Sequence, residues 1–385
     1  MAKYKIAYLP GDGIGNDVLD AAKQVLNVSG FDAEYIPLDI GFTVFENEGD
    51  PLPQRTIDGL KECDAALFGA ITSKPGSDPS VKAVEKKFGT KYRSPIVRLR
   101  QTFNLYSNMR PSKSYPGNPL NFRKSDGTEP EIDLVCFREN TEGLYAGIEF
   151  NKMVPELKEL PNFKAFQERT GAADEDVRIS CRVFTVKGVE RIIRKAFEYA
   201  VQNGRKRVTV VHKANVIRET CGLFLEKGKE IAKEYPDIEM TEENIDATAM
   251  WLVKRPEFYS VIVTSNMFGD ILSDQSAMLT GGLGFAASAS TSESFGLFEP
   301  NHGSAPKHAG QNKVNPIAAI LSIKLMWEWL GDKDAELKEL SRKLDQAVAQ
   351  NVKDAKVRTY DLGGTSTTTE VAADIARIFA GLIKK

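Results

Sequence analysis

The chain has 385 residues, of which 42% are hydrophobic and 27% charged, a composition typical of a globular protein with two domains or one large one. Its 51 basic and 53 acidic side chains give a net charge of −2, which excludes a global basic field for nucleic acid or a membrane surface. No apolar run approaches the roughly 18 residues that a membrane-spanning helix needs.

Strand-like and helix-like segments alternate along the chain. Buried strands are predicted at 4–10, 32–38, 64–70, 132–139, 207–213 and 260–266. Helices are predicted at 16–28, 52–60, 93–103, 188–202, 218–235, 244–254, 316–330, 333–350 and 370–383. This alternation is typical of an α/β protein with a mostly parallel sheet. The segment 140–181 is rich in charged and loop residues, which indicates an inserted arm.

Both the N-terminus and the cysteines point to a reducing compartment. The first strand begins almost at the first residue, so we expect no signal peptide. The four cysteines are far apart and form no C-x-x-C motif: Cys63, Cys136, Cys181 and Cys221. We therefore expect a cytoplasmic protein with neither a disulfide framework nor a zinc site.

The first strand leads into a glycine-rich loop, "PGDGIG" at 10–15. Its spacing is G-x-G-x-G, whereas dinucleotide-binding Rossmann folds carry G-x-G-x-x-G followed by an acid after the second strand. A tight strand-to-helix turn is therefore preferred over a Rossmann nucleotide site.

Two carboxylates, Asp270 and Asp274, are four residues apart in the stretch "NMFGDILSDQSA" at 266–277. On a helix they are neighbours, and like charges there repel each other. A buried strand precedes them, and "NMFG" is expected to form a short turn at the carboxyl end of the sheet, where α/β proteins usually bind ligands. This stretch alone supports a Mg²⁺ or Mn²⁺ site and a solvated polar face equally.

Several polar residues near strand or helix ends are further candidates. Arg100, Arg110 and Arg138 together would make a bidentate clamp for carboxylates, although each alone is more often a surface or ion-paired arginine. Lys213 follows a strand, where desolvation would suit a base, although ordinary ion pairing is the simpler alternative. Tyr145 alone would be a packing residue, and Asp246 alone a favourable charge at a helix start.

Long motifs in this sequence resemble those of the isocitrate/isopropylmalate dehydrogenase family, the β-decarboxylating dehydrogenases. They run in order from end to end: "PGDGIG", "FRENTEGLYAGIE", "VHKANVIRETCGLF", "NMFGDILSD", "GGLGFAASAS", "EPNHGSAPKHAGQNKVNP" and "RTYDLGG". The resemblance implies an α/β fold distinct from Rossmann. It implies a large cofactor-binding domain from 1–105 and 281–385, a small domain from 106–139 and 182–280, and a dimer clasp at 140–181.

By matching position, the resemblance implies a role for each candidate. Asp270 and Asp274 match ligands of Mg²⁺ or Mn²⁺, and Asp246 matches a third ligand donated by the other subunit of a homodimer or higher homo-oligomer. Arg100, Arg110 and Arg138, with Ser94, match the residues that bind a hydroxy-di- or tricarboxylate substrate. Lys213 of the other subunit and Tyr145 match the pair that removes and returns protons around hydride transfer and loss of CO₂.

The cofactor is the least consistent part of the resemblance. Family members bind it with residues that match Thr72, His302, Gly303, Ala305, Lys307, His308 and Asn315. NAD-type members usually have aspartate where this chain has Lys307, and a lysine there would attract the 2′-phosphate of NADP. The "RTYDLGG" ending is instead NAD-type. The sequence therefore favours NADP slightly over NAD.

The substrate's variable group is expected to meet the helix that starts at Ser94. Isocitrate enzymes usually show Ser-x-Asn-x-x-Leu-Arg, whereas this chain has isoleucine at position 96. We rank isocitrate first, because an NADP-type cofactor loop most often accompanies it, homoisocitrate second and 3-isopropylmalate third. A non-catalytic regulatory subunit of the same fold is disfavoured, because the metal acids and the Tyr145–Lys213 pair are all retained.

Overall fold

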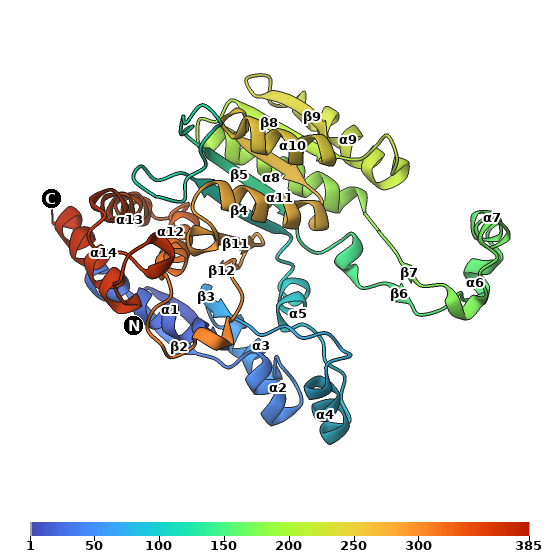
Figure 1. Cartoon of the computed structure of the whole chain (residues 1–385), viewed down its shortest axis with the longest axis horizontal. Coiled ribbons are helices and arrows are strands. Elements are labelled where there is room, and N and C mark those ends of the chain that lie inside the picture. The colour runs from blue at the N-terminus through green and yellow to red at the C-terminus, as the bar shows by residue number, and fades with distance from the viewer. Residues whose placement is uncertain (1, 385) are drawn as a thin grey trace.

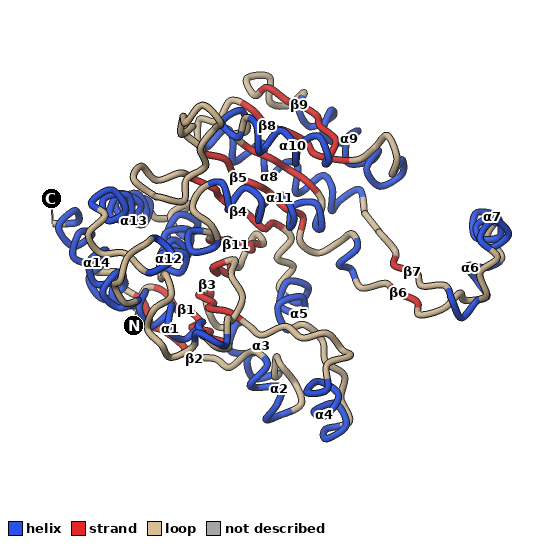
Figure 2. The backbone as a smooth tube through the Cα atoms, viewed as in Figure 1, coloured by secondary structure: helices blue, strands red, loops and turns tan. Residues whose placement is uncertain are grey.

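One ten-stranded sheet runs through the body of the protein in a computed structural model that describes residues 2–384 (Figures 1 and 2). Its strands follow the order β2-β1-β3-β12-β11-β4-β5-β10-β8-β9. In chain order they are β1 Tyr4–Gly11, β2 Ala33–Pro37, β3 Ala65–Ala70, β4 Ser107–Lys113, β5 Asp133–Glu139, β8 Arg207–His212, β9 Glu239–Asn244, β10 Val261–Thr264, β11 Ala287–Thr291 and β12 Gly296–Pro300. The predicted α/β class is confirmed.

Helices cover both faces of this sheet (Figure 2). The helices outside the arm are α1 Ile14–Ser29, α2 Phe42–Glu48, α3 Gln54–Lys61, α4 Pro79–Phe88, α5 Pro95–Thr102, α8 Val186–Gln202, α9 Arg218–Ala232, α10 Ile245–Lys254, α11 Asn266–Leu279, α12 Ile317–Leu330, α13 Ala335–Asp354 and α14 Thr368–Ile383. No helix within residues 2–384 has both the length and the apolar character needed to cross a bilayer.

The sheet is parallel at both ends and antiparallel in its centre. β2, β1, β3 and β12 pair in parallel, as do β5, β10, β8 and β9. The pairs β12–β11, β11–β4 and β4–β5 are antiparallel. The sheet is therefore rich in parallel pairs, as predicted. The antiparallel pairing at its centre was not predicted.

Four strands of this sheet were not predicted: β4, β9, β11 and β12. β4 reads "SNMRPSK", β9 "EMTEEN" and β11 "ASAST", so none of these three has the apolar run that marks the predicted strands. The buried side chains of β4 and β11 are mostly small or polar, and several form hydrogen bonds, as between Asn108 and Ser290 at 2.8 Å. One expectation is corrected: "NMFG" at 266–269 is the first turn of α11 rather than a loop before it.

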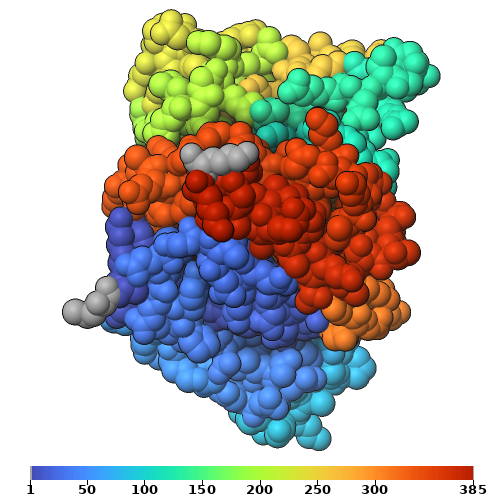
Figure 3. All heavy atoms as spheres, turned by 90° about the vertical axis from the view of Figure 1, so that its left-hand side faces the viewer, coloured from blue at the N-terminus to red at the C-terminus, as the bar shows by residue number. Residues whose placement is uncertain are grey.

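The two ends of the chain pack together in one half of the body. α1 packs against α14, and β12 lies between β3 and β11. Figure 3 shows the C-terminal residues as a band between the N-terminal residues and the middle of the chain. A cluster around the buried Trp327 joins α1, α12, α13 and α14. A separate cluster around Phe197 forms the core of the other half. The proposed domain limits at 105/106 and 280/281 remain predictions.

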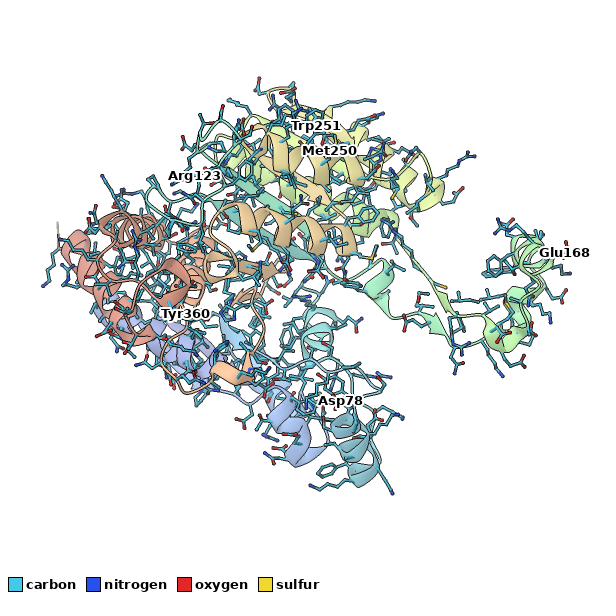
Figure 4. All side chains as sticks on the ribbon, viewed as in Figure 1. Asp78, Arg123, Glu168, Met250, Trp251 and Tyr360 are labelled. Atoms are coloured by element: carbon cyan, nitrogen blue, oxygen red, sulfur yellow. The ribbon has the colours of Figure 1, made fainter. Side chains whose placement is uncertain are left out.

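The segment 140–181 extends from the body as an arm, with α7 at its far end (Figures 1 and 4). It holds the paired strands β6 Glu149–Phe150 and β7 Ile179–Ser180, with α6 Pro155–Lys158 and α7 Pro161–Thr170 between them. Glu168 is labelled at its outer end in Figure 4. Apolar side chains on the arm stay exposed, including Leu160 at 48% and Phe166 at 39%.

Candidate active site

Two buried arginines come from neighbouring strands of the antiparallel centre. Arg138 on β5 is paired with Asn108 on β4, and Asn108 is two residues before Arg110 on the same strand. All three side chains therefore point to one face of the sheet. Arg110 donates to Asn108 Oδ1 at 2.6 Å and to Ser273 Oγ at 2.8 Å. Arg138 donates twice to Asn266 Oδ1, at 2.9 and 2.7 Å. Both guanidinium groups are therefore held by neutral side chains as well as by acids.

Helix α11 supplies the acids that face these arginines. Asp270 Oδ1 accepts from Arg138 and, at 3.2 Å, from Arg110, which also reaches Asp274 Oδ1 at 3.4 Å. Burial raises the pKa of Asp274, the charge of Asp270 raises it further, and Arg110 opposes both. The side chain of Asp274 is nevertheless 58% exposed, so one carboxylate of the pair is open to solvent.

Positive charge is concentrated and poorly solvated here. Burial, with the like charges of Arg110 and Arg100, lowers the pKa of Arg138 to about 9, although Asp270 opposes that shift. Burial also lowers the pKa of Arg100, whose guanidinium reaches Glu299 at 3.3 Å while its Nε has no partner. Because buried charges need partners, these groups are suited to an anionic ligand with more than one carboxylate.

Tyr145 joins the cluster from the base of the arm. It lies in a 3₁₀ turn, Leu144–Ala146, and its hydroxyl donates to Asp270 Oδ2 at 3.1 Å. The guanidinium of Arg138 lies 5.5 Å from its ring centre. Burial raises the pKa of Tyr145, and the charge of Asp270 adds to the shift. The phenol is therefore kept protonated and can act as a proton donor.

Lys213 and Asp246 form a second, separate pair. Lys213 follows β8 and its Nζ lies 2.5 Å from Asp246 Oδ1, whose pKa that contact lowers. Asp246 is 68% exposed and neither residue is hydrogen-bonded to Asp270 or Asp274. Within residues 2–384 no three His, Cys, Asp or Glu side chains gather as a metal site. Within one subunit, Asp270 and Asp274 thus lie together on α11, whereas Asp246, the third predicted metal ligand, pairs with Lys213.

The pair lies beside an exposed apolar surface on α10 and α11. Four side chains on these helices are about half exposed or more: Met250, Val253, Ile271 and Met278. Figure 4 labels Met250 and its neighbour Trp251 on α10. The two helices contact each other, partly through Gln275, which donates to the Ala249 carbonyl at 2.6 Å. Exposed apolar side chains on two contacting helices are suited to a protein interface.

The predicted cofactor residues lie along the loop after β12 and beside β3. Thr72 Oγ1 is 2.7 Å from Ser304 Oγ, and the Ser304 carbonyl accepts from the Ile14 amide at 2.9 Å. Ala305 has φ = 34°, an unusual value for a non-glycine residue that signals a constrained turn. The loop is therefore held against the start of α1.

Asp12, in the "PGDGIG" turn, was not predicted to matter, yet it joins three segments around this loop. Its buried carboxylate accepts from the amides of Phe42, Thr43 and Thr72, at 2.7, 2.9 and 2.9 Å. The signal available in the sequence was an acid flanked by glycines, where the backbone can approach closely. The turn thus fixes the position of Thr72.

The remaining cofactor candidates differ in their exposure. Lys307 is exposed, whereas His302 has a buried Nε2 without a partner, and burial lowers its pKa. Gly303 lies between His302 and Ser304 with open space around its Cα. Asn315 donates to Asp361 at 3.1 Å. The His308 ring lies 6.4 Å from that of Tyr360, so the loop and the "RTYDLGG" ending are adjacent.

Helix α5 carries the residues expected to meet the substrate. Ser94 precedes it and its side chain makes no cap hydrogen bond, so the hydroxyl is free for another contact. Ile96 packs into the apolar cluster on the β1–β3 side. Val97, by helical spacing, lies on the same side as Ser94 and Arg100. The isoleucine that stands where isocitrate enzymes usually have asparagine therefore packs against the core.

Three further residues at the site were not predicted: Asn266, Ser273 and Glu299. The first two lie on the face of α11 that includes Asp270, so the i, i+4 and i, i+3 spacing with that residue was a usable signal. Glu299 lies in β12, a strand that was itself not predicted. It contacts Arg100 of α5, and only the fold brings these two residues together.

Comparisons with known proteins all identify dehydrogenases of one family. The family model described as isocitrate/isopropylmalate dehydrogenase matches residues 5–375. A homoisocitrate dehydrogenase of Methanocaldococcus jannaschii is 44% identical over 96% of each chain. A 3-isopropylmalate dehydrogenase of Methanothermobacter thermautotrophicus is 40% identical, covering 98% of this chain and 99% of its own. The crystal structure of isocitrate dehydrogenase from Methylococcus capsulatus superposes with a TM-score of 0.83 at 39% identity, covering 98% of this chain and 99% of that one.

Proposed function

The chain belongs to the isocitrate/isopropylmalate dehydrogenase family, and from that premise we propose that it oxidatively decarboxylates isocitrate to 2-oxoglutarate with NADP as acceptor. The family consists of decarboxylating dehydrogenases that depend on NAD(P) and a divalent metal, and they act on small hydroxy acids. One observation carries the proposal: Arg110, Arg138 and Tyr145 all converge on Asp270.

The donor set fits a hard divalent cation. Asp270 and Asp274 offer carboxylate oxygens one helical turn apart, and Mg²⁺ or Mn²⁺ prefers oxygen ligands while keeping several waters. When bound, the cation would stabilise negative charge on the substrate's oxygens, and the nicotinamide would accept a hydride. We assign Asp246 of a second subunit as the third ligand.

The protein's own groups account for binding and proton movement. Arg100, Arg110 and Arg138 bind the substrate's carboxylates, which serve as further anionic partners for these buried cations. Lys213 of a second subunit takes the proton of the substrate's hydroxyl through a water. Tyr145, held protonated beside Asp270, donates its proton to the carbon that loses CO₂.

A shared site requires a homodimer or a larger assembly of identical subunits, and family members are usually dimeric. The exposed apolar face of α10 and α11 is suited to such an interface, because Asp246 opens α10 and Asp270 lies on α11. The extended arm, with its exposed Leu160 and Phe166, would clasp the partner.

The substrate proposal rests on α5. The Ser94 hydroxyl is suited to a carboxylate on the variable group, which isocitrate and homoisocitrate have and 3-isopropylmalate lacks. The half-buried Val97 beside it would also tolerate an extra methylene or an isopropyl group. Homoisocitrate or 3-isopropylmalate with NAD is therefore the second candidate, and relatives with those names are at least as similar to this chain.

The cofactor proposal rests on the exposed charge of Lys307 at the constrained turn after Ala305. A lysine there would attract the 2′-phosphate of NADP, whereas an acid would repel it. Tyr360 and Asp361 lie beside the same loop and belong to an ending more typical of NAD enzymes. NADP is favoured because the lysine's charge acts directly on the group that distinguishes the two cofactors.

A matrix of kcat/KM values tests this function. Purified protein would be assayed with isocitrate, homoisocitrate and 3-isopropylmalate, each with NADP and with NAD, in the presence of Mg²⁺. The highest value is expected for isocitrate with NADP. A maximum for another substrate or for NAD would replace that part of the proposal, and no turnover with any pair would leave the regulatory-subunit alternative.

A further inference from the structure

A second cavity lies on the opposite face of the central strands from the arginine cluster. It encloses about 380 Å³ between α8 on one side and α12 and α13 on the other, with β4, β5 and β11 as its floor. A pocket of about 170 Å³ adjoins it and shares Tyr199, Lys324 and Glu328 with it. The volume falls within the range typical of small-molecule sites.

Strand β4 separates this cavity from the proposed active site. Ser107 and Met109 line the cavity, whereas Asn108 and Arg110 point to the α11 face, because side chains alternate along a strand. None of the residues proposed for catalysis, metal or cofactor lines the cavity. It is therefore a separate site and not an extension of the first.

Most charged groups in its walls already have partners. Lys324 pairs with Glu328 at 2.6 Å, and Lys338 pairs with Asp332 at 3.1 Å. Asp345 accepts from Lys113 at 2.6 Å and from the Tyr115 hydroxyl at 2.7 Å. Apolar side chains make up much of the remaining lining: Met109, Phe137, Leu325 and Trp329.

Two charged side chains of the lining and one buried hydroxyl have no partner among residues 2–384. The charged pair is Lys195 and Glu198, both half-buried on α8, which form no ion pair or hydrogen bond there. The Ser107 hydroxyl is also unpartnered, although the residue is only 1% exposed. A buried hydroxyl without a partner is uncommon in folded proteins, so a polar atom of a ligand or a water in the cavity would satisfy it.

We propose that this cavity binds a free α-amino acid with an apolar side chain. Lys195 and Glu198 are three residues apart on α8, so their Cβ atoms are about 5–6 Å apart. An α-amino acid carries its carboxylate and ammonium on one carbon and can therefore face both at once. A simple acid or amine would leave one of the two charges unpaired. The side chain would pack on Met109, Phe137 and Leu325.

Binding is measured on the intact protein by isothermal titration calorimetry and by the fluorescence of Trp329, with L-leucine and L-phenylalanine as probes. Saturable binding is expected for the better-fitting of the two. 4-Methylpentanoate and 3-methylbutylamine, which are leucine without its amino or carboxylate group, should bind roughly tenfold or more weakly, because each loses one charged contact.

Two variants address the charges, and a third is a matched control. Lys195→Met and Glu198→Gln should each weaken binding of the amino acid by roughly tenfold or more. Lys187→Met removes an exposed, unpaired lysine from the same helix and should change nothing. Far-ultraviolet circular dichroism checks that all three fold. Absence of saturable binding by either probe, or equal binding by wild type and Lys195→Met, would overturn the proposal.

A consequence for catalysis rests on the proposed function and is measured separately. Because β4 presents Ser107 to the cavity and Arg110 to the substrate, occupancy of the cavity should change the KM for the hydroxy acid. Binding without any change in KM would disprove this coupling alone. Binding by a protein that turns over none of the tested substrates would contradict the proposed function and leave the amino-acid site intact.

Discussion

Asp270 has one observed role and one proposed role, and the two exclude each other. In the structure its carboxylate accepts from Arg110, Arg138 and Tyr145, which neutralises buried charge. As a metal ligand, the same oxygens must turn to the cation. The substrate's carboxylates then replace Asp270 as partners of the arginines, so metal and substrate should bind cooperatively.

Metal dependence is the first prediction at this scale. EDTA should abolish turnover, and Mg²⁺ or Mn²⁺ should restore it. Asp274→Asn removes one ligand charge with little change of shape and should raise the Mg²⁺ needed for half-maximal activity by roughly 10–100-fold or more. Asp237→Asn, at an exposed loop position, is the matched control. Wild-type activity of Asp274→Asn at limiting Mg²⁺ would remove Asp274 from the metal site.

The cofactor gives the second prediction. Lys307→Asp replaces attraction with repulsion at the 2′-phosphate. A charge-assisted contact contributes about 1.5–3 kcal/mol, so KM for NADP should rise by one to two orders of magnitude while NAD use stays equal or improves. Lys313→Asp reverses a charge six residues further on and controls for general electrostatics. An unchanged NADP/NAD ratio of kcat/KM in Lys307→Asp would make Lys307 an ordinary solvated lysine.

At the site, helix α11 and strand β5 come unusually close to each other at one residue, Gly269. α11 packs on β5 at Gly269, where an added Cβ would lie 2.6 Å from Arg138 Cβ and 2.8 Å from its Cγ. Only glycine allows the helix to come close enough for Asp270 to meet Arg138. The depth of α11 against the sheet therefore sets the geometry of the cluster.

The third prediction tests this contact. Gly269→Ala should destabilise the protein, because overpacking costs about 1–3 kcal/mol and outweighs the ~0.5–1 kcal/mol that alanine gains in a helix. Gly222→Ala on α9 meets nothing within 4 Å and should stabilise by that smaller amount. Urea unfolding midpoints would show the opposite signs. Equal midpoints for the two variants would mean that α11 can shift without cost.

The sequence predicted the elements with buried aliphatic runs and the residues inside long family motifs. Asp270, Asp274, Arg110, Arg138 and Tyr145 were predicted and do meet. Sequence patterns could not reveal β4 and β11, because small and polar side chains are buried there through mutual hydrogen bonds. Asp12 and Glu299 could not be predicted either, since their partners come from distant segments that only the fold joins.

At the scale of the whole molecule, the separation of Lys213 and Asp246 from the arginine cluster is the central fact. Within one subunit, no hydrogen bond or ion pair joins Lys213 or Asp246 to Asp270 or Asp274. The proposal therefore depends on a second copy that brings its own Lys213 and Asp246 to the first copy's Tyr145 and Asp270. Two identical half-sites related by a two-fold axis would give two complete sites.

Subunit mixing is the fourth prediction. Lys213→Met and Tyr145→Phe variants should each be nearly inactive alone. After mixing and demonstrated exchange, half the dimers are hybrids and each hybrid has one intact site, so about one quarter of wild-type activity should return. Recovery should be absent when either variant is mixed with itself. No recovery from the hybrids would place Lys213 and Tyr145 in the same subunit's site.

The joining of the two chain ends also sets an order of folding. β3 needs β12 as its neighbour, and α1 needs α14, yet β12 and α14 leave the ribosome long after their partners. The segment from β4 to α11 is continuous and can bury the cluster around Phe197 first. Until synthesis ends, the N-terminal strands have an unpaired edge, which makes the nascent chain the stage most prone to aggregation.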